Sequence, residues 1–310
     1  MRNKQLSLLL FCSICFIWGT TWLAMEVAVS TIPPIFATCL RFLIASPILI
    51  LLAKIFNQPL LFPKGKNKWI AIVAIFYFAI PFTLMIAGEM YISSGLASII
   101  FANMPIAVMI TSTIFLKLRL AIHQFIGLFI AIISLYIILS NELGLGLGGN
   151  NLLIGSSALA LAVAMHAIMY VMVQKYCKDI QVITYNALPS FIAAILLFCC
   201  SLAFEHVDIT VFSTPSLIAV AYLGIFASVG GIVAYFKLGQ ISTPFTASIC
   251  FLIFPLVALT LSTLTSNATI STQSIMMLLP LLSGIFLTKI SINSTYFRHH
   301  IINKFVKVKS

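Results

Sequence analysis

The chain has 310 residues, of which 62% are hydrophobic and 7% are charged, whereas about a quarter of an ordinary soluble domain is charged. This small number of polar residues could not cover the core of a water-soluble protein of this length. Lipid is therefore the expected solvent for most of the chain. The formal net charge of +11 does not indicate a nucleic acid partner. The basic residues lie in short segments between apolar runs, where orientation in a membrane explains them.

Runs of about 18 or more apolar residues indicate membrane helices, because about 20 helical residues cross the ~30 Å hydrocarbon layer. Ten such spans are predicted. They cover residues 6–27, 36–56, 69–90, 95–116 and 121–139 in the first half, and 152–173, 182–204, 217–236, 244–264 and 275–292 in the second. Arg2 and Lys4 before the first run also fit a signal peptide. We interpret the run as a retained helix, because it is too long and lacks a convincing cleavage site.

Basic residues occupy alternate connections between the predicted spans. They are Arg2 and Lys4; Lys54, Lys64, Lys66 and Lys68; Lys117 and Arg119; Lys175 and Lys178; Lys237; and Arg298, Lys304, Lys307 and Lys309. The opposite connections contain Glu142, Glu205 and Asp208 and no Lys or Arg. The positive-inside rule then places both termini in the cytoplasm of a multi-pass protein of the bacterial inner membrane.

Cysteines and glycines do not indicate a metal or nucleotide site. Cys12 and Cys15 have the spacing of a metal or redox pair, but no second ligand pair accompanies them, so we interpret them as apolar filler. The glycine-rich segment 141–151 follows a membrane helix and lacks a P-loop lysine, so it is predicted to be an extracytoplasmic linker. No metal and no cofactor are predicted.

The two halves of the sequence resemble each other. A shift of 150 positions, without gaps, superimposes Ile75-Phe76 on Ile225-Phe226, Ala97-Ser98-Ile99 on Ala247-Ser248-Ile249, Phe101 on Phe251, Pro105 on Pro255, and Ser112-Thr113 on Ser262-Thr263. Five spans per repeat is an odd number, so the two repeats must insert in opposite orientations. The predicted fold is therefore an all-α membrane protein of ten transmembrane helices arranged as two inverted five-helix repeats, as in secondary transporters.

Pro105 and Pro255 fall near the middle of the fourth and ninth predicted spans. A proline there leaves the carbonyl four residues earlier, at Phe101 or Phe251, without its usual partner. Such breaks are tolerated beside protein or a water-filled cavity, so both prolines are candidate gates or hinges; a packing kink is the alternative. Asn103, two residues before Pro105, could bind substrate or hold helices together.

Ionisable residues inside a span cost on the order of 3 kcal/mol near the bilayer centre, so each needs a partner or an aqueous path. Arg41 lies about level with Glu26 and Glu89 in the predicted topology, and the three are candidates for a charged cluster in the outer half of a cavity. A structural ion pair of Arg41 is the alternative. Glu89 could couple export to a proton gradient, or it could be a solvated helix-end carboxylate.

Aromatic and polar residues at helical spacing supply the other candidates. Trp18, Trp22 and Glu26 share one helix face that could bind an organic cation. An interfacial aromatic belt, with Glu26 among the headgroups, accounts for Trp22 equally well. His166 and Tyr170 occupy the corresponding position in the second half and are candidates for the opposite cavity wall. A hydrogen bond from His166 to a neighbouring helix is the alternative.

An ordered set of motifs carries a family resemblance over nearly the whole chain. The motifs are WGTTW at 18–22, RF at 41–42, EMY at 89–91, SGLA at 94–97 and MP at 104–105. This pattern resembles the EamA-like family of the drug/metabolite transporter superfamily. The resemblance implies repeats at 1–140 and 152–295, followed by a basic cytoplasmic tail at 296–310. One departure is the absence of the Gly-Glu pair that often follows the fourth and ninth helices, which leaves no such acid for helix-end contacts or coupling.

The expected function is secondary transport of a small metabolite, such as an amino acid, an amine or a related organic solute or drug. The resemblance implies export or exchange by alternating access around spans one, three, four, six, eight and nine, with spans five and ten peripheral. Uptake is the alternative direction. An enzyme is not expected, because no catalytic acid, base or metal set is recognisable. The alternatives to a transporter are a membrane-embedded enzyme, a channel or a non-transporting membrane scaffold. The expected partners are the substrate and the lipid bilayer, with the protein a monomer or homodimer.

Overall fold

The computed structural model describes residues 2–117, 121–144, 149–177, 180–241, 250–265 and 270–289, and within these ranges every regular element is a helix. The first half contains α1 (Arg2–Ala28), α2 (Pro34–Ile55), α3 (Lys68–Val73), η1 (Ala74–Ala79), α4 (Ile80–Gly88), α5 (Ser94–Phe101), α6 (Met104–Leu116) and α7 (Ile122–Gly144). The second half contains α8 (Gly149–Tyr176), α9 (Val182–Phe204), η2 (Ile209–Val211), α10 (Thr214–Tyr222), η3 (Leu223–Gly230), α11 (Gly231–Ile241), α13 (Cys250–Thr265) and α14 (Thr272–Lys289).

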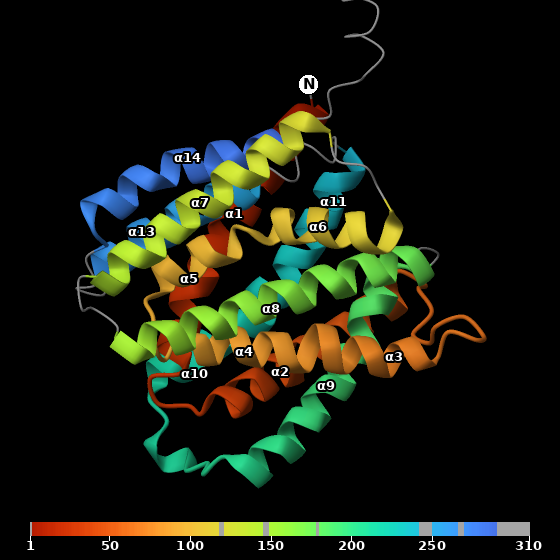
Figure 1. Cartoon of the computed structure of the whole chain (residues 1–310). Helices are drawn as coiled ribbons and strands as arrows, with labels where there is room; N and C mark the ends of the chain where they lie inside the picture. Colours follow the sequence, from red (N-terminus) through yellow and green to blue (C-terminus); the bar gives the residue numbers. More distant parts are fainter. Residues whose placement is uncertain are drawn as a thin grey trace, which may run out of the picture.

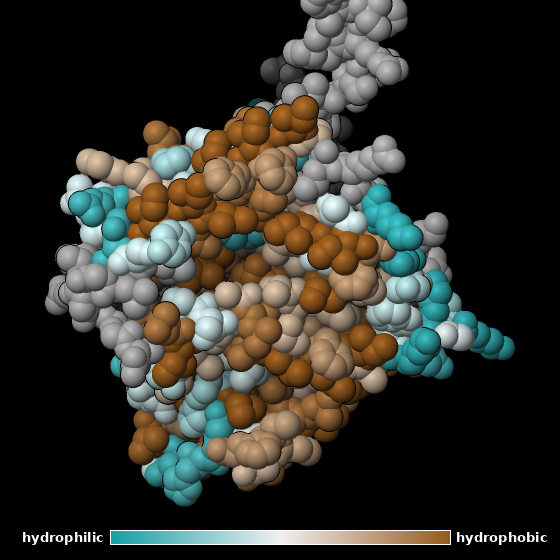
Figure 2. Space-filling view, viewed as in Figure 1, coloured by the Kyte–Doolittle hydropathy of each residue, from teal (hydrophilic) through white to brown (hydrophobic). Residues whose placement is uncertain are grey.

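Seven helical segments in the described residues are long and apolar enough to cross a membrane: Gln5–Ala28, Pro34–Ile55, Lys68–Gly88, Ser94–Leu116, Asn151–Val173, Val182–Phe204 and Thr214–Tyr235. Three shorter apolar helices, Ile122–Ile138, Ile253–Thr265 and Thr272–Thr288, lie where the remaining spans are predicted. Large apolar side chains such as Phe16, Phe129 and Leu279 are at least 60% exposed. Apolar residues also cover much of the face in Figure 2, with hydrophilic ones gathered near its ends. The chain is therefore a multi-pass membrane protein.

Several predicted boundaries differ from the structure. Helix α7 continues to Gly144 and α8 begins at Gly149, so helices extend into the predicted linker 141–151, and residues 145–148 lie outside the described ranges. The basic tail 296–310 and the start of the ninth predicted span also lie outside them.

The helices pack in pairs that join the two halves of the chain. Helix α2 lies along α9, and α7 lies along α14 (Figure 1). Helix α1 packs on α11 and α13, whereas α8 packs on α4 and α6. The α7–α14 pair crosses at Gly127 and Gly284, where a Cβ added to Gly127 would lie 2.5 Å from the Gly284 carbonyl oxygen. Only glycine, which has no side chain beyond a hydrogen atom, therefore fits at this crossing.

The third and eighth spans each contain a π-helical segment, η1 and η3, in which the backbone hydrogen bonds reach one residue further than in an α-helix. The matched pairs Ile75-Phe76 and Ile225-Phe226 lie within these two segments. Each segment packs on the α2–α9 pair: η3 contacts α2, and η1 contacts α9. A π segment changes the direction of the side chains that follow it relative to a continuous α-helix.

The fourth predicted span, 95–116, is divided into two helices in the structure. Ala102 and Asn103 separate α5 from α6, and Pro105 lies in the first turn of α6, where a missing N–H costs little. The Asn103 side-chain amide donates to the carbonyls of Ile99 and Ile100 at 3.0 and 3.3 Å, which caps the end of α5. At the equivalent position of the second half stands Ile253, which cannot donate, and Pro255 lies inside α13.

Two glutamates cap helices that are distant in sequence. Glu205, after α9, accepts hydrogen bonds from the backbone N–H groups of Ile35 and Phe36 at 2.7 and 2.9 Å. Glu26 accepts one from the backbone N–H of Ser94 at 3.1 Å. A carboxylate at a helix N-terminus satisfies unpaired N–H groups and complements the helix dipole, so Glu205 fixes the start of α2 and Glu26 fixes the start of α5.

Candidate functional site

A cavity of about 340 Å³ lies at the centre of the helix bundle. Its walls come from α1, α2, α4, α5, α6, α8, α9, α11 and α13, together with both π segments. Neither α7 nor α14 contributes a described residue to the lining. Both halves of the chain therefore build one site, with the α7–α14 pair outside it.

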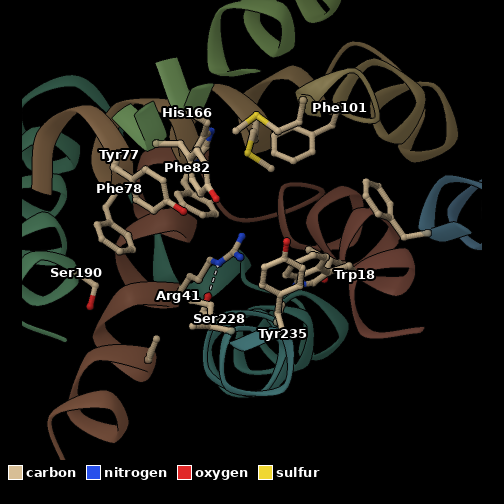
Figure 3. Close-up of a pocket in the computed structure, with 18 of the residues that line it drawn as sticks. Trp18, Arg41, Tyr77, Phe78, Phe82, Phe101, His166, Ser190, Ser228 and Tyr235 are labelled. Carbon is tan, nitrogen blue, oxygen red and sulfur yellow. Dashed lines mark hydrogen bonds between the residues drawn. The ribbon is translucent and has the colours of Figure 1, made fainter. Parts of the chain in front are cut away.

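Arg41 projects from α2 into this cavity (Figure 3) and is only 5% exposed. Its Nε donates to the hydroxyl of Ser228 in η3 at 2.8 Å, and its Nη1 lies 3.7 Å from the sulfur of Met25. The guanidinium carbon also lies 4.6 Å from the centre of the Phe82 ring, a cation–π distance. None of these contacts is acidic, and the remaining guanidinium N–H groups have no acceptor among the described residues.

His166, from α8, lines the cavity. Its Nδ1 lies 3.0 Å from the carbonyl of Ala162 on its own helix. A carbonyl can only accept, so Nδ1 carries the proton and Nε2 of the neutral ring is an acceptor. The ring stands edge-on to Tyr77 and Phe82, each with centroids 5.0 Å away. Tyr170, one turn further along α8, also lines the cavity and is 52% exposed.

Trp18 and Trp22 form the α1 side of the cavity. The Trp18 ring lies 5.2 Å from that of Tyr235 and 5.6 Å from that of Phe251. Trp22 is 3% exposed and its ring lies 5.2 Å from that of Phe101. Both tryptophans thus belong to the aromatic wall, and the interior position of Trp22 does not fit a headgroup belt.

Electrostatic interactions link Glu89 to both Glu26 and Arg41, but Arg41 makes no direct contact with either carboxylate. Arg41 contacts Ser228 rather than a carboxylate, and Glu26 caps α5. Glu89, directly after α4, is 5% exposed, and neither of its carboxylate oxygens has a hydrogen-bond partner among the described residues. Neither glutamate is among the lining residues of the cavity, so Glu89 is a buried carboxyl group beside it rather than a solvated helix end.

The remaining candidates divide between the cavity and its supports. Pro105 lines the cavity, whereas Asn103 and Pro255 do not, and the amide of Asn103 holds the end of α5. Among the described residues, no group of three or more His, Cys, Asp or Glu could hold a metal ion.

Sequence reasoning missed the π-segment residues Tyr77 and Ser228, and also Phe82 and Tyr235. The available signal was a hydroxyl or an aromatic ring within the third and eighth spans, the two spans expected to move around the site.

A sequence model of the EamA-like transporter family matches residues 5–140 and 153–290. The chain is 46% identical to Protein PagO of Salmonella typhimurium, over 94% of this chain and 95% of that protein. It is 45% identical to an uncharacterized transporter of Buchnera aphidicola subsp. Schizaphis graminum, over 94% of this chain and 96% of that one. It is also 26% identical to the uncharacterized inner membrane transporter YedA of Escherichia coli, over 87% of each chain.

One solved crystal structure superposes with a TM-score of 0.63 at 17% identity, covering 91% of this chain and 95% of that one. This likeness shows a shared fold. The family and the names of the relatives indicate a transporter rather than an enzyme.

Proposed function

This chain belongs to the EamA-like transporter family, and from that membership we propose that it moves a small organic metabolite across the bacterial inner membrane by alternating access. The observation that carries the proposal is the central cavity, which both halves of the chain enclose and which contains a buried arginine with unused donors. A relative named as an inner membrane transporter supports the location.

The proposed architecture has ten spans in two inverted repeats. Two observations support it. The family model matches the two halves separately, at 5–140 and 153–290. The packing is also reciprocal: α1 lies on the eighth and ninth spans, and α8 lies on the third and fourth. Two structurally equivalent repeats of opposite orientation would produce this exchange of partners. Cytoplasmic termini follow from the positive-inside rule.

Opening toward each side would use the interruptions in the spans around the cavity. The break at Asn103 before Pro105 and the two π segments all lie next to lining residues, and such irregular backbone is a common place for helices to bend. Pro255 would be the corresponding hinge of the second half. Export or exchange is the proposed direction, with Glu89 as the proton-coupling group, because it is a buried carboxyl group without a hydrogen-bond partner in the described residues.

The test is transport by purified protein in proteoliposomes loaded with a mixture of metabolites and amino acids, read by mass spectrometry with and without a pH gradient. The variant Val108→Trp, which would fill the cavity from α6, serves as the blocked control, and size-exclusion chromatography checks that it folds. We expect saturable, selective loss of some solutes that the blocked variant abolishes. If the folded protein moves no solute under either condition, the transport proposal is overturned. Loading the mixture outside instead of inside distinguishes uptake from export.

A further inference from the structure

We propose that the cavity selects organic monoanions: molecules with one carboxylate or similar acidic group on an aromatic or bulky apolar body, and without a free ammonium group. This inference rests on the proposed transport function and narrows its substrate. It departs from the amino acids and amines expected from the sequence.

The charge of the cavity is the first argument. Its described lining contains one permanent cation, Arg41, and no Asp or Glu. The Nε group of that arginine is bonded to the neutral hydroxyl of Ser228. Glu89 acts on Arg41 electrostatically but lies outside the lining, and its oxygens make no hydrogen bond to the guanidinium. A buried charge without an acidic partner in direct contact is costly in a low-dielectric interior. A monoanion would neutralise the chamber, a zwitterion would leave its net positive charge in place, and a cation would add to that charge.

The geometry of the arginine is the second argument. The Nε of Arg41 donates to the Ser228 hydroxyl at 2.8 Å, and the Phe82 ring lies 4.6 Å from the guanidinium carbon. These two contacts occupy the Nε edge and one face of the guanidinium. The two Nη atoms at its end remain as the donors, with only a weak sulfur contact from Met25. Paired N–H groups in one plane match the two oxygens of a carboxylate, which is the pairing that arginine forms best.

The walls are the third argument. Figure 3 shows Arg41 between two aromatic groups, with Trp18 and Tyr235 on one side and Tyr77 and Phe82 on the other. A volume of about 340 Å³ is at the lower end of the range for ligand pockets, which suits a molecule with a single ring. Aromatic faces also attract ammonium groups, but here such a group would share the chamber with a guanidinium of the same sign.

A matched ligand series tests this selectivity on the unmodified protein. The probes are 3-phenylpropanoate, phenylalanine and 2-phenylethylamine, which carry a similar phenyl-bearing body with an acid alone, an acid and an ammonium group, and an ammonium group alone. Binding is followed by tryptophan fluorescence of the protein in nanodiscs, because two of the three tryptophans, Trp18 and Trp22, line the cavity. We expect 3-phenylpropanoate to bind about 10-fold or more tightly than phenylalanine, and the amine not to bind.

Two variants assign the effect to Arg41. Arg41→Gln should weaken 3-phenylpropanoate binding by about 10- to 100-fold, and Arg41→Lys, which keeps the charge but not the paired donors, by less. Lys64→Gln, a charge removal in the exposed loop before α3, should leave binding unchanged. If phenylalanine or the amine binds as well as the acid, or if none of the three binds, the monoanion proposal is overturned. The transport proposal survives either result as long as the metabolite mixture still moves in proteoliposomes.

Discussion

The cap that Glu205 places on α2 can be removed by a single substitution. The carboxylate accepts two backbone N–H bonds, from Ile35 and Phe36, and a third from the hydroxyl of Ser201 at 2.8 Å. Glu205→Ala removes all three and leaves the backbone N–H groups of Ile35 and Phe36 without an acceptor. At roughly 1 kcal/mol net for each bond, reduced by partial exposure to water, the expected loss is about 2 to 3 kcal/mol.

Such a loss corresponds to a fall in melting temperature of roughly 4 to 8 °C, measured as thermal unfolding of the detergent-solubilised protein. Glu205→Gln keeps one acceptor oxygen but turns an amide group toward the second N–H, so about half of the loss is expected. Because α2 carries Arg41, transport should fall along with stability.

The matched control is Asp208→Asn in the same connection. Hydrogen bonds from the hydroxyl and backbone N–H of Thr210 lower the pKa of Asp208, but this carboxylate is exposed and bonds only within its own turn. Its substitution should leave the melting temperature nearly unchanged. If Glu205→Ala unfolds at the same temperature as Asp208→Asn, the cap contributes nothing to stability and the reasoning is wrong.

Three further predictions concern transport and packing. Glu89→Gln, which cannot exchange a proton, should preserve folding and substrate exchange but abolish the effect of a pH gradient on net flux; an undiminished gradient effect in liposomes would exclude Glu89 as the coupling group. Gly127→Leu should separate α7 from α14, because even a Cβ there would lie 2.5 Å from the Gly284 carbonyl oxygen. The free energy of unfolding should fall by about 2 kcal/mol or more. Gly65→Leu cannot serve as the control, because Gly65 has a positive φ. Gly231→Ala places a Cβ 2.5 Å from the indole nitrogen of Trp18, so the fluorescence maximum should move; an unchanged spectrum would contradict this contact.

Sequence reasoning located the apolar segments and much of the cavity because both depend on strong local signals. Long apolar runs mark the helices, and Arg41 and His166 are conspicuous as ionisable residues inside them. Trp18, which the helical spacing groups with Trp22 and Glu26, lines the cavity.

The remainder depends on contacts that a single sequence does not display. The sequence shows Glu205 only as an acid in a connection between spans, because its partners, Ile35 and Phe36, lie about 170 residues earlier in the chain. Ser228 gave no warning of its bond to Arg41, because a serine within a uniformly apolar run does not reveal which way it faces. The π segments are invisible for the same reason: where nearly every residue is apolar, a local change of helical period leaves no pattern.

The crossing of α7 and α14 has a consequence for how the molecule is made. Synthesis reaches the end of α7 at Gly144, but its partner is complete only at Lys289. During that interval the Gly127 face has only lipid or transient neighbours against it, and the small residue lets lipid chains fill the place that Gly284 later takes. The contact between α7 and α14 therefore forms among the last steps of biogenesis, and a chain that stops short of α14 would leave the Gly127 face of α7 uncovered.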